Sequence, residues 1–292
     1  MQARISHGLL ARRIAGTLLI ASLCLSAAPA ALARADTPPP VEACNPSVLA
    51  IDGNRIWAHR NGTGATTVVF EAGFGNDSTI WAGIEPRIRA AGAATLVYDR
   101  AGMGQSVIDT TQPYSLDNDV HILRTMLSRC GVTGPVVFVG HSYGGAIGLA
   151  AAGKDARFKG LVLLDAVVPG VWTPAEVDRN LKTMRPQYDD IRKQAPALAR
   201  VAIPWAEALP QTAAEVNALR IDEKLPITEI VAEKGQSDPE SAKAWHSAQA
   251  AFTTGHPARR YILAEGSSHK VMLDKPDLVV ESILAMVRRT QQ

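Results

Sequence analysis

The sequence predicts an α/β domain built on a mostly parallel central sheet with helices on both faces. After an opening hairpin, short runs rich in β-branched residues alternate with longer helical segments. A serine bounded by glycines stands where one buried run stops, in the stretch "VVFVGHSYGGAIG" at 136–148. Residues 168–225 are helical and rich in charge, and they interrupt the alternation. We therefore interpret them as a helical cap inserted after strand 6.

Six strands are predicted between residues 47 and 165. Runs at 47–52 and 55–60 flank Gly53-Asn54, and this arrangement is typical of a hairpin. The elements expected after the hairpin are a strand at 66–73, a helix at 79–91, a strand at 94–99, a helix at 116–130, a strand at 136–140 with the helix that follows it, and a strand at 160–165. Strands that alternate with helices in this way are typical of a parallel sheet with crossover helices.

The alternation resumes beyond the cap. Asp274 precedes Lys275-Pro276 and is typical of a cap on the last helix. The elements expected here are strands at 227–232 and 259–265 and helices at 242–252 and 278–289, so that residues 45–167 and 226–292 form the α/β core.

The first 35 residues have the outline of a secretory signal peptide. A basic segment precedes an uncharged apolar run from Ile14 to Ala33. Ala33-Arg34-Ala35 is a small-x-small cleavage site, so we expect cleavage after Ala35, a linker at 36–44 and a secreted or periplasmic mature protein. An uncleaved membrane anchor is the alternative, because the apolar run is nearly long enough to span a bilayer.

Removing the signal peptide changes the charge balance and the cysteine count. Residues 1–35 contain four arginines and no acid, so the mature chain carries 26 basic and 28 acidic residues, which gives no concentrated basic face for nucleic acid. Cys44 and Cys130 remain, and an even pair in an exported chain favours a disulfide that closes a loop of about 85 residues and stabilises by roughly 4 kcal/mol. Two buried free thiols are the alternative, since a bond requires that the two Cα atoms approach closely.

The glycines around Ser142 have a steric explanation. A strand that reverses into a helix within two residues forces strained dihedral angles and close backbone contacts. Glycine at 140 and 144 relieves those contacts and leaves the serine side chain at the tip of the turn. The pattern G-x-S-x-G, here Gly140-His141-Ser142-Tyr143-Gly144, is therefore interpreted as a nucleophile elbow.

Chemically useful residues follow several predicted strands. In open α/β sheets, ligands bind beyond the carboxyl ends of the strands. The residues that follow the strands are Gly73-Phe74-Gly75, Asp99-Arg100, Ser142, Asp165, the loop 233–238 and His269. A serine, several acids and a histidine are thus expected at one edge of the sheet, in the chain order Ser, acid, His.

With these motifs, the sequence resembles the α/β-hydrolase superfamily, serine-nucleophile (esterase- and lipase-like) branch, over nearly all of residues 45–290. The motifs that carry the resemblance are "EAGFG", "YDRAGMGQS", "GHSYGG", "LLDAVVP" and "GSSHKVMLDKPD". The resemblance implies the α/β-hydrolase fold and an exported serine hydrolase that cleaves carboxylic esters, with thioesters, lactones and amides as further candidate substrates. The alternatives are an acyltransferase or perhydrolase that uses the same triad, and a non-catalytic ligand-binding protein on this fold.

Each catalytic role can be assigned to a residue on chemical grounds. A serine hydroxyl needs a base within hydrogen-bond reach, and His269 is the histidine placed after the last strand. The backbone N–H groups of Tyr143 and Phe74 are the expected oxyanion-hole donors. The position of Phe74 departs from the pattern, because Ala72-Gly73 stands where many relatives have His-Gly.

Three acids compete for the role of orienting His269. Asp165 ends the sixth strand directly, and a minority of relatives carry their acid at this position. Asp238 stands in Gly235-Gln236-Ser237-Asp238, which fits the G-x-x-D pattern that most relatives place after the seventh strand. Asp238 also precedes Pro239 at a helix start, where it would serve as an N-cap. We select Asp165, with Asp238 as the alternative and Glu233 as the third candidate.

The remaining motifs point to no further ligand. The histidines show no metal-ligand spacing, and the sequence contains no phosphate loop or dinucleotide fingerprint. We therefore predict no cofactor, no metal, no nucleic-acid partner and no stable membrane span after processing. The predicted partner is a small-molecule ester substrate.

Overall fold

The computed structural model describes residues 44–236 and 238–291. The predicted signal peptide and all of the predicted linker except Cys44 lie outside them. Within the described residues, one sheet of eight strands has the order β1-β2-β4-β3-β5-β6-β7-β8. The strands are β1 (Ser47–Ile51), β2 (Asn54–Asn61), β3 (Thr67–Glu71), β4 (Ala94–Tyr98), β5 (Val136–His141), β6 (Phe158–Leu164), β7 (Ile227–Lys234) and β8 (Arg259–Ser268).

The sheet is mostly parallel, as predicted. β2 pairs antiparallel with β1 and with β4, which confirms the opening hairpin, and every other strand pair is parallel. All residues of β3, β4 and β5 are buried. Continuous burial explains why these strands are near-continuous apolar runs, because a parallel sheet is covered on both faces.

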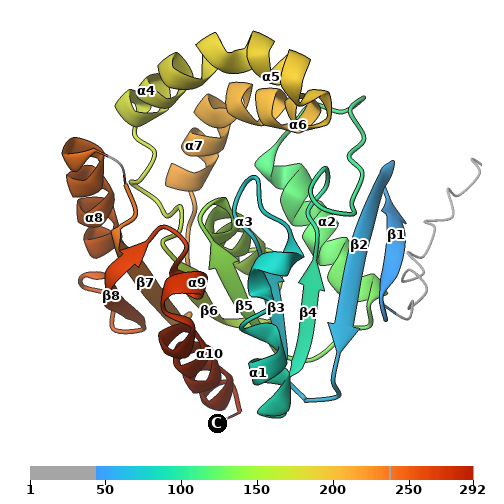
Figure 1. Cartoon of the computed structure of the whole chain (residues 1–292). Coiled ribbons are helices and arrows are strands. Elements are labelled where there is room, and N and C mark those ends of the chain that lie inside the picture. The colour runs from blue at the N-terminus through green and yellow to red at the C-terminus, as the bar shows by residue number, and fades with distance from the viewer. Residues whose placement is uncertain (1–43, 237, 292) are drawn as a thin grey trace, which may run out of the picture. The chain divides into compact units, whose positions relative to one another are not determined.

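Helices cover both faces of the sheet in Figure 1, and each face carries a separate apolar core. Alternate strand residues contribute to each, so that Val69 and Phe138 face one core while Phe70 and Val139 face the other. The first core packs against α2 (Leu116–Arg129), α3 (Tyr143–Ala152) and α8 (Pro239–Thr253). The second core packs against α1 (Glu85–Ala90), α9 (Val271–Asp274) and α10 (Pro276–Arg289).

The chain between β6 and β7 is helical throughout most of its length. Its elements are α4 (Pro174–Met184), the 3₁₀ turn η2 (Arg185–Gln187), α5 (Tyr188–Gln194), α6 (Pro196–Glu207) and α7 (Leu209–Asn217). These helices lie beyond the ends of the strands in Figure 1, and aromatic side chains from this segment contact residues that follow β3 and β5. We refer to residues 168–225 as the cap.

Local differences from the expected elements have local causes. The helix expected at 79–91 is divided into a 3₁₀ turn, η1 (Ser78–Trp81), and α1, because Pro86 at the start of α1 cannot donate a backbone hydrogen bond to the preceding turn. β7 and β8 run further than expected, and their pairing shifts register between Ala232 and Lys234. Glu233 therefore lies within a strand rather than in a loop.

Cys44 and Cys130 form the disulfide that the cysteine count favours. Their Cα atoms are 5.4 Å apart, and both residues are buried in the first core. The bond ties the segment before β1 to the end of α2. None of the helices in the described part of the chain is long and apolar enough to cross a bilayer.

Candidate active site

Ser142 occupies a strained turn between β5 and α3. Its backbone has φ 52° and ψ −123°, a conformation that costs free energy for a residue other than glycine. A Cβ atom at Gly140 would lie 2.9 Å from the carbonyl oxygen of Gly144, and one at Gly144 would lie 2.6 Å from the carbonyl oxygen of Glu71. The glycine pattern thus has the steric cause expected of a nucleophile elbow, and Ser142 remains partly exposed.

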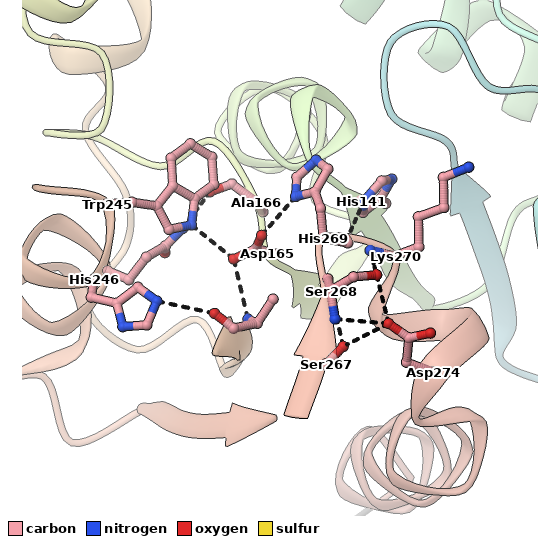
Figure 2. A network of polar contacts seen from close by, with 12 residues as sticks. His141, Asp165, Ala166, Trp245, His246, Ser267, Ser268, His269, Lys270 and Asp274 are labelled. Atoms are coloured by element: carbon pink, nitrogen blue, oxygen red, sulfur yellow. Dashed lines mark hydrogen bonds and ion pairs between the residues drawn. The ribbon is translucent and has the colours of Figure 1, made fainter. Parts of the chain in front are cut away.

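The structure brings Asp165 to His269. His269 directly follows β8, and Asp165 directly follows β6. The His269 Nδ1 atom lies 2.6 Å from Asp165 Oδ2 (Figure 2). The other carboxylate oxygen, Oδ1, accepts from the Trp245 indole N–H at 2.8 Å and from the Ala232 amide at 3.2 Å. Asp165 is fully buried, so these donors replace the water that a carboxylate would otherwise bind.

The two other candidate acids lie elsewhere. Asp238 is the N-cap of α8 and accepts from the Ser241 amide at 2.9 Å, and this bond holds the pKa of its exposed carboxyl below the usual value. Glu233 is exposed and accepts from the Gly266 amide at 2.7 Å. Neither carboxylate is hydrogen-bonded to His269 among the described residues.

Trp245 is a site residue that the sequence reasoning missed. It lies on α8, 80 residues after Asp165, and its indole N–H fixes one oxygen of the carboxylate. No local pattern could have identified it, because the contact depends on how α8 packs beside the carboxyl end of β6.

Gly235 leaves room for the Asp165 carboxylate. A Cβ atom built on Gly235 would overlap Asp165 Oδ2, the oxygen that faces His269. We expect Gly235→Ala to displace that oxygen and lower kcat about 100-fold, because small misplacements of a catalytic group have effects of this size. Gly83→Ala is the matched control, since a Cβ there meets nothing within 4 Å. Steady-state kinetics of the two variants would contradict this expectation if both kept wild-type kcat.

The backbone around His269 is held from two sides (Figure 2). Asp274 accepts from the Ser268 amide at 2.8 Å and from the Ser268 hydroxyl at 2.6 Å. The prediction that Asp274 caps the last helix is wrong, because the residue before α10 is Lys275 and no side chain caps that helix. On the other side, the His141 Nε2 atom lies 2.9 Å from the carbonyl oxygen of His269.

His141 is buried and neutral. Burial, together with the nearby His269, lowers its pKa from 6.5 to about 3. Its ring centroid lies 4.6 Å from that of His269, and Nε2 must carry the proton that is donated to the His269 carbonyl. The elbow histidine therefore supports the position of His269 through a hydrogen bond to its backbone and a ring contact.

This pKa shift predicts a loss of stability in acid. Between pH 6.5 and 3 the unfolded chain binds a proton at His141 that the folded chain excludes, so the free energy of unfolding falls as the pH falls. The slope is about 1.4 kcal/mol per pH unit. The stability of the wild-type protein minus that of His141→Gln should therefore fall by about 2 kcal/mol between pH 7 and pH 5. Urea titrations at both pH values test this, and an unchanged difference would refute it.

Glu229 is a second buried carboxyl group close to Asp165. It lies in the middle of β7 and is fully buried, and its Oε1 atom accepts from the Ala166 amide at 3.4 Å. Burial, followed by the proximity of Asp165, raises the pKa of Glu229 well above its usual value. Its sequence signal is the single acid inside the apolar run "ITEIVA".

The two expected oxyanion donors lie on segments that touch at the elbow. Tyr143 begins α3, and a Cβ atom at Gly73 would lie 3.0 Å from the Ser142 Cβ, so the loop that carries Phe74 packs against Ser142. Within residues 44–236 and 238–291, neither the Tyr143 N–H nor the Phe74 N–H donates to a protein acceptor.

Four aromatic side chains gather beside the elbow. Phe74 stacks on Trp205 of the cap, with ring centroids 4.1 Å apart. Tyr143 lies 6.1 Å from Trp172 and 5.8 Å from Trp205 by the same measure. This aromatic cluster, made of Phe74, Tyr143, Trp172 and Trp205, joins the cap to the two segments that carry the candidate donors. In the described residues, no group of three or more His, Cys, Asp or Glu side chains is arranged to hold a metal ion.

Comparisons with known proteins identify similar chains. The chain is 37% identical over 108 residues to the uncharacterized protein YqjL of Bacillus subtilis, a match that covers 37% of this chain and 42% of the relative. It is 29% identical over 109 residues to a proline iminopeptidase of Saccharolobus solfataricus, covering 37% of this chain and 35% of the relative. The chain thus aligns with less than half of the length of either relative.

A solved structure and a family model extend the similarity to most of the chain. An esterase from Exiguobacterium antarcticum superimposes with a TM-score of 0.61 at 17% identity, covering 83% of this chain and 99% of the esterase. That likeness shows the shared fold. The model of the alpha/beta hydrolase family matches residues 68–282, which include Ser142, Asp165 and His269. Because this match spans well over half of the sequence, the chain belongs to the alpha/beta hydrolase family.

Proposed function

We propose that this protein is an exported serine hydrolase that cleaves carboxylic esters through an acyl-enzyme on Ser142. The observation that carries the proposal is the 2.6 Å contact between His269 Nδ1 and Asp165 Oδ2 at the sheet edge where Ser142 stands in its strained elbow. A serine, a histidine and a buried carboxylate in this order are the components of a hydrolytic triad.

The arrangement assigns a role to each group. The Nδ1–H group of His269 donates a hydrogen bond to Asp165. In this tautomer Nε2 carries no proton, so it can take the proton of the Ser142 hydroxyl. The Ser142 Oγ then bonds to the carbonyl carbon, and the carbonyl oxygen becomes an oxyanion. Collapse of this intermediate breaks the ester C–O bond, and the imidazolium returns the proton to the leaving alcohol.

Water completes the cycle by the same steps. His269 removes a proton from the water as it attacks the acyl-enzyme, and then protonates Ser142 Oγ as the carboxylic acid leaves. The Tyr143 and Phe74 amides stabilise the oxyanion in both halves of the reaction. Asp165 stabilises the imidazolium through its hydrogen bond to Nδ1.

Two further findings support the proposal. The similarity to a proline iminopeptidase keeps amide bonds among the candidate substrates, beside thioesters and lactones. The Cys44–Cys130 bond supports export, because structural disulfides form and persist in oxidising compartments.

The aromatic cluster predicts a preference for small and medium acyl groups. Trp205 stacks on Phe74 directly beside the elbow, so its indole occupies space that a longer acyl chain would need. The measured quantity is kcat/KM for p-nitrophenyl octanoate divided by kcat/KM for p-nitrophenyl acetate. We expect Trp205→Ala to raise this ratio by about tenfold or more, which is the effect of one to several methylene groups in an apolar pocket. Leu198→Ala is the control, since Leu198 is an exposed residue of the same helix. An unchanged ratio in Trp205→Ala would refute the prediction.

A fluorophosphonate probe combined with short p-nitrophenyl esters tests the proposed function. We expect the probe to label Ser142, as identified by mass spectrometry of the labelled peptide, and to abolish ester hydrolysis in proportion to labelling. Adding alcohols or hydrogen peroxide as acceptors distinguishes hydrolysis from acyl transfer and perhydrolysis by the products formed. A protein that is neither labelled at Ser142 nor active on any ester would overturn the proposal.

A further inference from the structure

Arg100 is a buried cation that the proposed chemistry does not use. It follows β4, is 4% exposed, and pairs with Glu71 at the end of β3 through a contact of 2.6 Å between Nη1 and Oε1. Taking the two charges of an ion pair out of water costs free energy, and the attraction between the charges often does no more than offset that cost. The remaining contacts of Arg100 indicate what the pair is for.

Arg100 donates to the backbone of the loop that carries Phe74. Its Nη1 lies 2.8 Å from the carbonyl oxygen of Ala72, and its Nη2 lies 3.3 Å from that of Gly73. The Gly73 oxygen also accepts from the Asn76 amide at 3.2 Å. The Gly73 carbonyl and the Phe74 N–H belong to one planar trans peptide group, so they point in opposite directions. Holding the carbonyl on Arg100 therefore sets the direction in which the Phe74 N–H points.

The same guanidinium contacts the residue that carries the second amide. Its Cζ atom lies 5.3 Å from the centroid of the Tyr143 ring, within the range of a cation–π contact. The hydroxyl at the far end of the Tyr143 side chain donates to Asp119 at 3.0 Å. Asp119 also accepts from the Tyr114 hydroxyl at 2.6 Å. Tyr143 is thus held both by its ring and by its hydroxyl, and these two contacts fix the start of α3, where its backbone N–H lies.

We propose that Arg100 is a positioning residue that aligns the Phe74 and Tyr143 amides as one oxyanion site. One rigid, planar, multidentate donor connects the peptide group of the first amide with the side chain of the second. A cation on the Gly73 carbonyl also polarises that peptide group, which makes the Phe74 N–H a stronger donor. This inference rests on the proposed function, because it assumes that an oxyanion forms at Ser142.

A pair of substrates isolates this role from general stability. In a thionoester, sulfur replaces the carbonyl oxygen, and this larger, weaker acceptor gains little from donors placed for an oxyanion. The ratio of kcat/KM for a p-nitrophenyl ester to that for the matched thionoester therefore reports on donor alignment. Loss of folded protein lowers both rates equally and leaves the ratio unchanged.

Arg100→Lys keeps a cation but loses the planar fork. We expect kcat/KM for the oxygen ester to fall about 100-fold, mainly through kcat, with a much smaller change for the thionoester, so that the ratio falls at least tenfold. The double variant Glu71→Met with Arg100→Met removes both charges together, so it leaves no unpaired buried carboxylate that could cause misfolding. We expect the same fall in the ratio for this double variant. Arg157→Lys is the control, because Arg157 likewise pairs with a carboxylate, Asp155, and donates to a backbone carbonyl at Val132.

The outcomes separate this inference from the proposed function. If the wild-type enzyme hydrolyses the ester and is labelled at Ser142, but the ratio for Arg100→Lys and for the double variant stays at the wild-type value, the inference alone is overturned. A wild-type protein that cleaves neither ester overturns the proposed function and this inference with it. A fall in the ratio for the Arg157→Lys control would also contradict a specific role for Arg100.

Discussion

Replacing Asp165 with asparagine is expected to lower kcat for ester hydrolysis by about four orders of magnitude, with little change in KM. The Asp165 carboxylate accepts a hydrogen bond from the Nδ1–H group of His269, which fixes the tautomer whose Nε2 can accept a proton from Ser142. Asparagine keeps the shape of the side chain but can present its amide N–H to Nδ1, which favours the wrong tautomer. It also removes the charge that stabilises the imidazolium.

The matched comparison is Asp238→Asn. Asp238 accepts one hydrogen bond from the Ser241 amide at the start of α8, and asparagine is also a good N-cap. We expect wild-type kcat and a change in the free energy of unfolding of less than about 1 kcal/mol. Steady-state kinetics on one ester with both purified variants is the measurement. Near-normal turnover in Asp165→Asn together with a large loss in Asp238→Asn would reverse the assignment.

Removing the Cys44–Cys130 bond is expected to lower the free energy of unfolding by about 4 kcal/mol. The two cysteines are 86 residues apart in sequence, so without the bond the unfolded chain regains the conformational freedom of a long loop. For a domain of this size, the loss corresponds to a fall in Tm of about 10 °C.

Two routes to the reduced state check this expectation against each other. The variant Cys44→Ala with Cys130→Ala and the wild-type protein in reductant should melt at similar temperatures, as measured by circular dichroism. Both cysteines are buried, so the alanine variant also loses packing contacts and should be slightly the less stable of the two. A reduced wild-type protein that melts at the temperature of the oxidised one would show that the bond does not stabilise the fold.

The fold was predictable from the sequence because its signals are local. The runs at 66–73, 94–99 and 136–140 indicated strands of a mostly parallel sheet, and the structure confirms them as β3, β4 and β5. The glycines around Ser142 indicated a tight strand-to-helix turn, since only a residue without Cβ fits where the backbone passes another chain segment so closely. Both signals arise from residues within a few positions of one another.

The sequence favoured Asp165 among the candidate acids, but the contact that supports this choice is visible only in the tertiary structure. By sequence, Asp165 and Asp238 each followed a strand, and the motif that most relatives use favoured Asp238. The contact between Asp165 and His269 joins residues 104 positions apart, and it depends on the order and register of β6, β7 and β8. The extra length of β7 and its register shift leave Asp238 at the start of α8 instead.

The order of the elements, the elbow at Ser142 and the set of polar residues expected at one edge of the sheet all follow from the amino-acid sequence. Two contacts of the site became evident only in the folded chain, that of Trp245 with Asp165 and that of Arg100 with the Gly73 carbonyl. The physical reason is that strand and helix patterns follow from backbone periods of two and 3.6 residues, which neighbouring positions reveal. Contacts between distant segments depend on how whole elements pack, and no short stretch of sequence contains that information.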